Sequence, residues 1–141
     1  MIPLSVLDLV PVREGSGVGE ALAEAGKLAA TAEQAGYKRF WVAEHHATAG
    51  VAGGAVSVVL AHIGHATSTI RIGAGGIMLP NHNPFVIAEQ FGTLDGLSPA
   101  GSISGSAARP ARRASSHRRC ARTCTRRPNT SLRTWSSCAR C

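Results

Sequence analysis

The stretch Phe40-Trp-Val-Ala-Glu-His-His-Ala-Thr-Ala-Gly50 joins four apolar residues directly to a carboxylate and two adjacent imidazoles. A strand with apolar side chains on both faces is typical of the inside of a parallel sheet. Residues 39–43 therefore predict a buried strand, and Glu44, His45 and His46 follow its C-terminal end. In α/β folds, ligands bind and reactions occur at that end of the strands.

The segments around this strand alternate between strand and helix patterns. Residues 2–12 and 70–75 are expected as strands, residues 18–35 and 55–67 as helices with Gly36 as a left-handed cap, and Asn83-Pro84 opens a helix through Leu94 that Gly96 can end. Such alternation implies parallel strands joined by right-handed crossovers. The sequence thus predicts an α/β fold, either the first three units of a TIM-type (β/α)8 barrel or half of a doubly wound sheet.

Charge divides the chain into two expected domains. Residues 1–98 hold five basic and all eight acidic residues, whereas residues 99–141 hold ten arginines, no acidic residue and all four cysteines. We expect residues 1–98 to be the partial barrel and residues 99–141 to be a disordered, low-complexity tail. The sequence has neither a long apolar run nor a basic leader segment, so we expect a cytoplasmic protein without a membrane span.

Glycines and histidines mark the candidate site. The Gly15-Ser-Gly17-Val-Gly19 cluster resembles a dinucleotide fingerprint, but Glu20 at the helix start disfavours a phosphate there. Gly75 and Gly76, late in the third strand, would let a flat ligand approach the main chain, and His82 follows in the next loop.

A metal site is not expected from the adjacent histidines. Neighbouring residues on an extended chain point to opposite faces, so His45 and His46 cannot easily reach one ion. His62 and His65 share a helix face but have no evident third ligand, which favours a core or interface role for both.

Four motifs together resemble the bacterial luciferase-like monooxygenase family. They are Phe40-Trp-Val-Ala-Glu-His-His46, Ile72-Gly-Ala-Gly-Gly76, Ile77-Met-Leu-Pro-Asn-His-Asn-Pro84 and Ala88-Glu-Gln-Phe-Gly-Thr-Leu-Asp95, and the resemblance covers residues 2–98. It implies a TIM-type barrel that uses a reduced flavin, either FMN or coenzyme F420, and O2 as co-substrate to oxidise a small organic molecule. It also implies a flavin reductase as the source of reduced FMN.

The resemblance also implies residue roles. His45 matches the family's proton-transfer residue beside the flavin, and Gly75 and Gly76 match the backbone that closes on the isoalloxazine ring. The same resemblance assigns Glu44, His46, Ile77 and His82 to the cofactor site. The family dimerises through its second and third helices, which fits the apolar residues 55–67 and implies a homodimer.

The resemblance stops where the family continues with a fourth strand. The chain reads Pro99-Ala-Gly-Ser-Ile-Ser-Gly-Ser-Ala-Ala-Arg-Pro110, and codons for this stretch, read one frame away, permit the family-like Arg-Val-Asp-Leu-Gly-Leu-Gly-Arg-Ala-Pro. We therefore hypothesise that residues from about 100 to 141 are a frameshifted translation and that the chain is an inactive, truncated fragment.

The alternative interpretation gives the tail a function. Its cysteines follow the pattern C-x3-C-x13-C-x2-C, which is near a zinc-binding spacing, and its arginines could neutralise nucleic-acid phosphates. The chain would then be a small α/β binding module with a basic zinc or nucleic-acid-binding tail.

Overall fold

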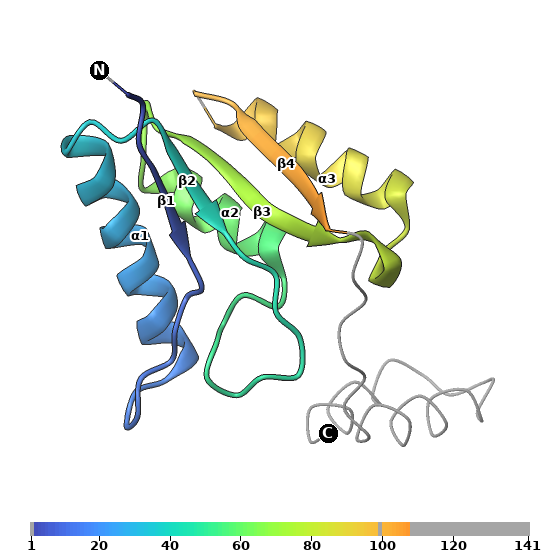
Figure 1. Cartoon of the computed structure of the whole chain (residues 1–141), viewed down its shortest axis with the longest axis horizontal. Helices are drawn as coiled ribbons and strands as arrows, with labels where there is room; N and C mark the ends of the chain where they lie inside the picture. Colours follow the sequence, from blue (N-terminus) through green and yellow to red (C-terminus); the bar gives the residue numbers. More distant parts are fainter. Residues whose placement is uncertain (1, 99, 108–141) are drawn as a thin grey trace, which may run out of the picture. The chain divides into compact units, whose positions relative to one another are not determined.

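A computed structural model describes residues 2–98 and 100–107 of the chain. Strands and helices alternate along the described residues in the order β1 (Ser5–Asp8), α1 (Val18–Gln34), β2 (Arg39–Val42), α2 (Val56–His65), β3 (Arg71–Met78), the short 3-10 helix η1 (Leu79–Asn81), α3 (Pro84–Leu97) and β4 (Ser102–Ala107). The strands form one parallel sheet (Figure 1). The alternation expected from the sequence is therefore confirmed.

The sheet is wound in a single direction. Its spatial order is β1-β2-β3-β4, the same as the order along the chain. Right-handed crossovers between sequential neighbours put every connecting helix on the same side of a sheet. In a doubly wound sheet the strand order reverses beside the first strand, which therefore lies inside the sheet, whereas β1 is at the edge of the four described strands. That alternative is therefore wrong for the described residues.

Alternate residues of the strands build the core on the helix side. Phe40 and Val42 of β2 are fully buried, and Ile72 of β3 is 1% exposed. Leu60 and Ile63 of α2 pack into the same cluster and are also fully buried. Each such side chain contributes about 1.5–3 kcal/mol by leaving water, so this side of the sheet supplies most of the folding energy.

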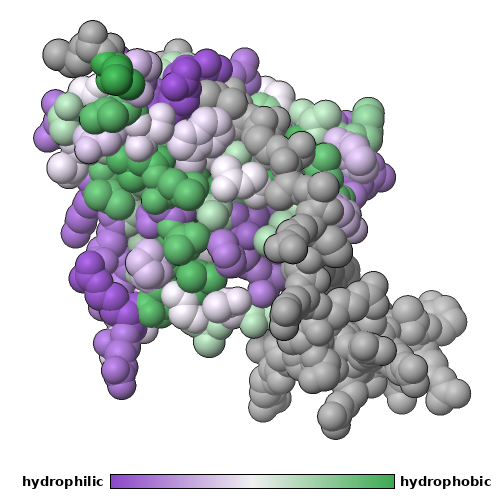
Figure 2. All heavy atoms as spheres, in the orientation of Figure 1, coloured by the Kyte–Doolittle hydropathy of each residue, from purple (hydrophilic) through white to green (hydrophobic). Residues whose placement is uncertain are grey.

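None of the described helices covers the opposite side of the sheet. Leu7 in β1 and Leu9 just after it are 59% and 45% exposed. Figure 2 shows this as a hydrophobic band that follows β1 on the face turned toward the viewer. In a closed parallel barrel, residues at these positions fill the interior.

The ends of the first helix follow their sequence signals. After α1, Gly36 adopts a left-handed φ of 83°, and the Tyr37 N–H bonds the Ala32 carbonyl oxygen at 3.0 Å, as in a Schellman cap. At the N-terminus, the Glu20 carboxylate accepts the Gly17 N–H at 3.1 Å. This carboxylate occupies the position where a phosphate would have to bind.

The third helix begins as expected but ends later. The Asn83 side chain accepts the Phe85 N–H at 2.9 Å, which confirms the predicted N-cap. The expectation that Gly96 ends the helix is wrong. The helix continues through Leu97, and the Ser98 N–H bonds the Leu94 carbonyl oxygen at 2.9 Å.

A fourth strand extends the sheet beyond the three that we expected. β4 pairs in parallel with β3, with Ile72 opposite Ser102 and Met78 opposite Ala107. We expected no strand here because residues 99–110 depart from the family pattern. Backbone pairing uses N–H and C=O groups that every residue except proline supplies, so a run of small residues can form a strand. The rest of the expected tail, residues 108–141, lies outside the described residues.

None of the helices in the described part of the chain is long and apolar enough to cross a membrane.

Candidate functional site

The candidate site lies where β2 and β3 end. Val42 is the last residue of β2, and Glu44 follows it by two positions. Met78 is the last residue of β3, and His82 comes directly after η1. β3 runs three residues past its expected end, so its last residues reach the segment that carries Glu44.

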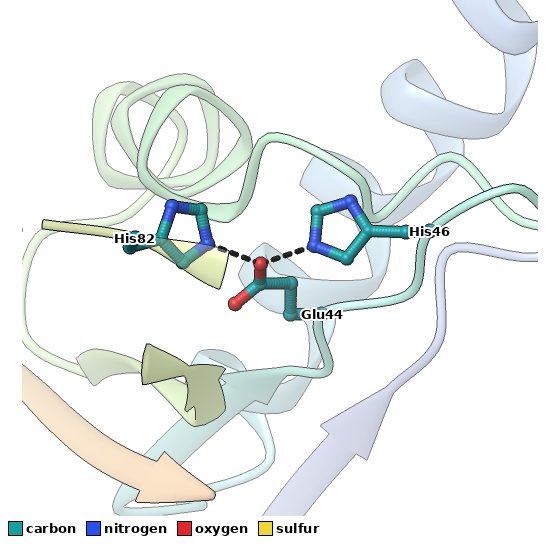
Figure 3. Close-up of side chains that lie close together, drawn as sticks. All are labelled: Glu44, His46 and His82. Carbon is teal, nitrogen blue, oxygen red and sulfur yellow. Dashed lines mark hydrogen bonds and ion pairs between the residues drawn. The ribbon is translucent and has the colours of Figure 1, made fainter. Parts of the chain in front are cut away.

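Glu44, His46 and His82 form a single cluster. The imidazole Nε2 atoms of His46 and His82 both contact the same carboxylate oxygen, Oε1 of Glu44, with His82 at 2.5 Å. Figure 3 shows the two rings on either side of the carboxylate. The other oxygen, Oε2, accepts the Met78 N–H at 2.7 Å. The side chain of Glu44 is only 1% exposed, and each imidazole is 29% exposed.

The environment keeps the Glu44 carboxylate charged. Burial alone would raise its pKa, but hydrogen bonds from His82, the Met78 N–H and His46 outweigh burial and hold the pKa below its ordinary value. The carboxylate accepts all three hydrogen bonds. A buried anion thus lies between two partly exposed imidazoles, which is an arrangement that can hold a proton or a cation.

His45 lies outside this cluster. Its backbone N–H bonds the Gly53 carbonyl oxygen at 3.3 Å. Its ring atom Nδ1 is buried and has no hydrogen-bond partner among the described residues. Buried polar atoms are nearly always paired, so this one marks a position where a ligand atom could complete the hydrogen bonding.

Gly75, the first of the two expected glycines, lies exposed on the uncovered side of the sheet. A Cβ added to Gly75 would lie 3.3 Å from both Leu7 Cδ1 and Trp41 Cβ. The missing side chain leaves the main chain of Gly75 accessible beside the Trp41 ring, and the peptide that joins Gly75 to Gly76 is cis. A flat ring system fits against such a surface.

Ile77 is placed differently from these glycines. Its side chain is 3% exposed and belongs to the core on the helix side. A ligand could therefore contact only the main chain of Ile77. Its assignment to the cofactor site stays a prediction, as do the assignments of the other residues.

Two loops brace the site. Val10, after β1, has a φ of 52°, which is rare for a β-branched residue. The Val10 N–H bonds the Asp8 carboxylate at 3.0 Å. The Val10 carbonyl oxygen accepts the Ala52 N–H at 2.8 Å. Strain of this kind persists where surrounding contacts hold it and is common near ligand sites.

Sequence reasoning identified all three members of the cluster but not their contact. Glu44 and His46 are two residues apart, so an extended chain places them on the same face. The same alternation that points His45 and His46 to opposite faces therefore places Glu44 and His46 on one face. His82 joins them only through the register of β2 and β3, which no local pattern reveals.

Comparisons with known proteins identify the family of the chain. The profile of the family described as luciferase-like monooxygenase matches residues 2–101. A luciferase-like monooxygenase of Escherichia coli (strain K12) is 51% identical over 98 residues, which is 70% of this chain and 29% of the relative. The chain therefore spans less than a third of that relative's length.

Solved structures confirm the fold. Apo-MsnO8 superposes with a TM-score of 0.71 at 40% identity over 75% of this chain and 32% of that chain. The oxygenating constituent of 3,6-diketocamphane monooxygenase from Pseudomonas putida, solved with FMN, has a TM-score of 0.71 at 17% identity, over 78% of this chain and 30% of that chain. The described sheet corresponds to part of a TIM-type barrel, as the sequence predicted. The chain belongs to the luciferase-like monooxygenase family.

Proposed function

We propose that the complete protein is a flavin-dependent monooxygenase, in which a reduced flavin supplies the electrons that activate O2 for oxidation of a small organic substrate. The observation that carries this proposal is the family match over residues 2–101, which includes every candidate site residue. FMN is the flavin bound by the diketocamphane monooxygenase constituent. FMN is therefore the first cofactor to test, and coenzyme F420 is the second.

Features of the site fit a flavin. Gly75 and Gly76 would support the flat ring with their main chain, because neither has a side chain and Gly75 is exposed beside Trp41. His45 would hold or move a proton at its ring nitrogens, one of which is buried and has no hydrogen-bond partner in the described part of the chain. Glu44, His46 and His82 would line the same edge of the barrel with a fixed arrangement of charge and N–H groups.

The 141-residue chain itself should bind flavin weakly or not at all. Barrel enzymes commonly bind the cofactor phosphate with loops after the seventh and eighth strands, and β4 is the last strand among the described residues. Titrating FMN into the purified chain, with flavin fluorescence as the readout, measures this directly. Tight binding of FMN would contradict this expectation and show that the four described strands are enough to hold the flavin.

The test of function needs the complete barrel. The gene should be resequenced around the codons for residues 97–101, and the family-like reading frame should be expressed if the nucleotides contain it. We expect that protein to consume O2 with reduced FMN from a flavin reductase and an organic substrate. If the nucleotides encode no family-like continuation in that shifted reading frame, the frameshift hypothesis fails.

A substitution in the restored protein tests the role of His45. His45→Ala should lower turnover by about 100-fold to 10,000-fold, the usual range for loss of a general acid or base. His65→Ala is the matched control, because His65 is an exposed histidine of α2. Equal turnover in the two variants would remove His45 from this role.

We also propose that the intact protein is a homodimer that uses α2 and α3. Val58 on α2 and Phe85 on α3 are 68% and 69% exposed, so each helix has a large apolar side chain that an interface between two copies would cover. Val58→Asp should shift the restored protein from dimer to monomer in sedimentation equilibrium. A monomer before substitution would contradict the proposal.

A further inference from the structure

We propose that Glu44, His46 and His82 form a binding site for a divalent first-row transition metal ion, for which Zn²⁺ is the reference. The proposal concerns the ion alone. It does not depend on a flavin or on the monooxygenase activity.

The geometry places three ligand atoms around one point. One oxygen of Glu44 and one ring nitrogen from each of His46 and His82 all lie within 4.8 Å of one another. Bonds of about 2.0–2.2 Å to a tetrahedral zinc would separate neighbouring ligand atoms by about 3.3 Å. Small rotations of the two imidazoles away from the carboxylate oxygen would therefore make room for an ion between the three side chains (Figure 3).

The ligand types select the class of ion. Two imidazoles with one carboxylate are a zinc-binding set in hydrolytic enzymes and an iron-binding set in oxygenases. Calcium and magnesium prefer sites made entirely of oxygen atoms. The donor set therefore favours a transition metal over either of these ions.

The surroundings fix the carboxylate in position. The Met78 N–H holds Oε2 of Glu44 at 2.7 Å, so Oε1 is left to face the two imidazoles. Hydrogen bonds from outer groups to metal-binding side chains typically raise affinity in this way.

The site is also accessible from solvent. Each imidazole is 29% exposed, whereas Glu44 is 1% exposed. An ion could thus enter from the imidazole side and keep water in its remaining coordination positions. When the ion binds, it would replace the two hydrogen bonds from the imidazoles to Oε1 of Glu44. Each imidazole would then carry its proton on Nδ1.

Cobalt titration tests the site in the full chain without flavin. Cys120, Cys124, Cys138 and Cys141 should first be changed to serine, because thiolates would bind the same ions. We expect one Co²⁺ per chain, with visible absorption bands of a nitrogen and oxygen site, and Zn²⁺ should displace it. His46→Ala and His82→Ala should each weaken binding by at least about 100-fold.

His65→Ala is the matched control and should leave the affinity unchanged, because His65 lies on α2 away from the cluster. Circular dichroism establishes whether each variant is folded, and His46→Gln and His82→Gln replace any alanine variant that is not. Equal affinity in the His46, His82 and His65 variants would overturn the proposal, and so would absence of a Co²⁺ spectrum.

A second measurement needs no change within the cluster. In a Zn²⁺ titration followed by NMR, the ring signals of His46 and His82 should shift together, whereas those of His62 and His65 should not. If all the histidines shift alike, binding is unspecific and the proposal fails. Neither experiment contains flavin, so this inference and the proposed function can fail separately.

Discussion

The two faces of the sheet have opposite surroundings although they are built from the same strands. On β2, Phe40 is fully buried against the helices, whereas its neighbour Trp41 points to the other side and is only half-buried. On β3, Ile72 lies in the core and Gly75 is exposed. Apolar content alone therefore does not tell which residues stabilise this chain.

The difference separates stability from function. The covered face binds the helices and holds the strands in register, while the uncovered face and the strand ends carry Gly75, His45 and the Glu44 cluster. A barrel interior is normally packed with side chains from all its strands. We therefore expect the covered face to respond strongly to substitution and the uncovered face weakly.

The largest expected effect comes from leucine substitutions on the two faces. Leu60→Ala should lower the free energy of unfolding by about 2–5 kcal/mol, because Leu60 is fully buried and its removal leaves a cavity. Leu7→Ala should change it by less than about 0.5 kcal/mol, because Leu7 is 59% exposed. Urea unfolding of both variants measures the difference. If both variants lost a similar amount of unfolding free energy, Leu7 would have to be buried against another chain in solution.

The second effect tests the loop that supports the site. A Cβ on Gly53 would lie 2.5 Å from the Ala43 carbonyl oxygen, so Gly53→Ala must displace the main chain beside Glu44. We expect a loss of about 1–3 kcal/mol in unfolding free energy. Gly19→Ala is the control, because Gly19 lies in α1 with nothing within 4 Å of an added Cβ. That variant should be unchanged or more stable by up to about 1 kcal/mol, and a loss as large as that of Gly53→Ala would contradict the close contact.

Much of the fold could be predicted from the sequence because its signals are local. The spacing of apolar residues predicted α1, and the caps Gly36 and Asn83 act within a few residues of the helix ends. The end of β3 could not be predicted in this way. Its last residues are held by β4 and by the bond from Met78 to Glu44, and both partners are distant in sequence.

The candidate site was predictable in composition but not in arrangement. The pattern Glu44-His45-His46 indicated chemistry at a strand end, and the alternation of an extended chain favours His46 over His45 as the partner of Glu44. The pattern did not show that His82 and the Met78 N–H would join them, because both come from the distant end of β3. β4 was missed for a related reason, since its pairing is made by main-chain groups rather than by a distinctive side-chain pattern.

A smaller effect involves Glu33, which joins the end of α1 to the start of β3 on the covered side. One oxygen, Oε1, accepts the N–H groups of Ser68, Thr69 and Ile70 and the hydroxyl of Thr69. Burial would raise the Glu33 pKa, but these bonds lower it from 4.5 to about 2.

A depressed pKa in the folded state adds stability that is complete above the unfolded pKa and lost as the pH falls through the folded pKa. Unfolding free energy should therefore decrease between about pH 4.5 and pH 2 because of Glu33. Glu33→Gln should remove this part of the pH dependence and cost about 1 kcal/mol at pH 7, since Glu33 acts much like a capping residue. Glu24→Gln is the control, because Glu24 is exposed and forms an exposed ion pair with Arg13. An identical pH profile in both variants would show that the Glu33 bonds do not form in solution.

The smallest expected change in stability is also the most direct test of the uncovered face. Leu7→Lys places a charge at a 59% exposed position, so its unfolding free energy should stay within about 0.5 kcal/mol of the original. The charge should nevertheless reduce self-association, because exposed apolar strands are sites where chains aggregate. Light scattering at increasing concentration measures this, with Lys27→Leu on the exposed side of α1 as the reverse control. If Leu7→Lys unfolds the chain instead, then Leu7 is packed in solution and the two faces are more alike than the structure indicates.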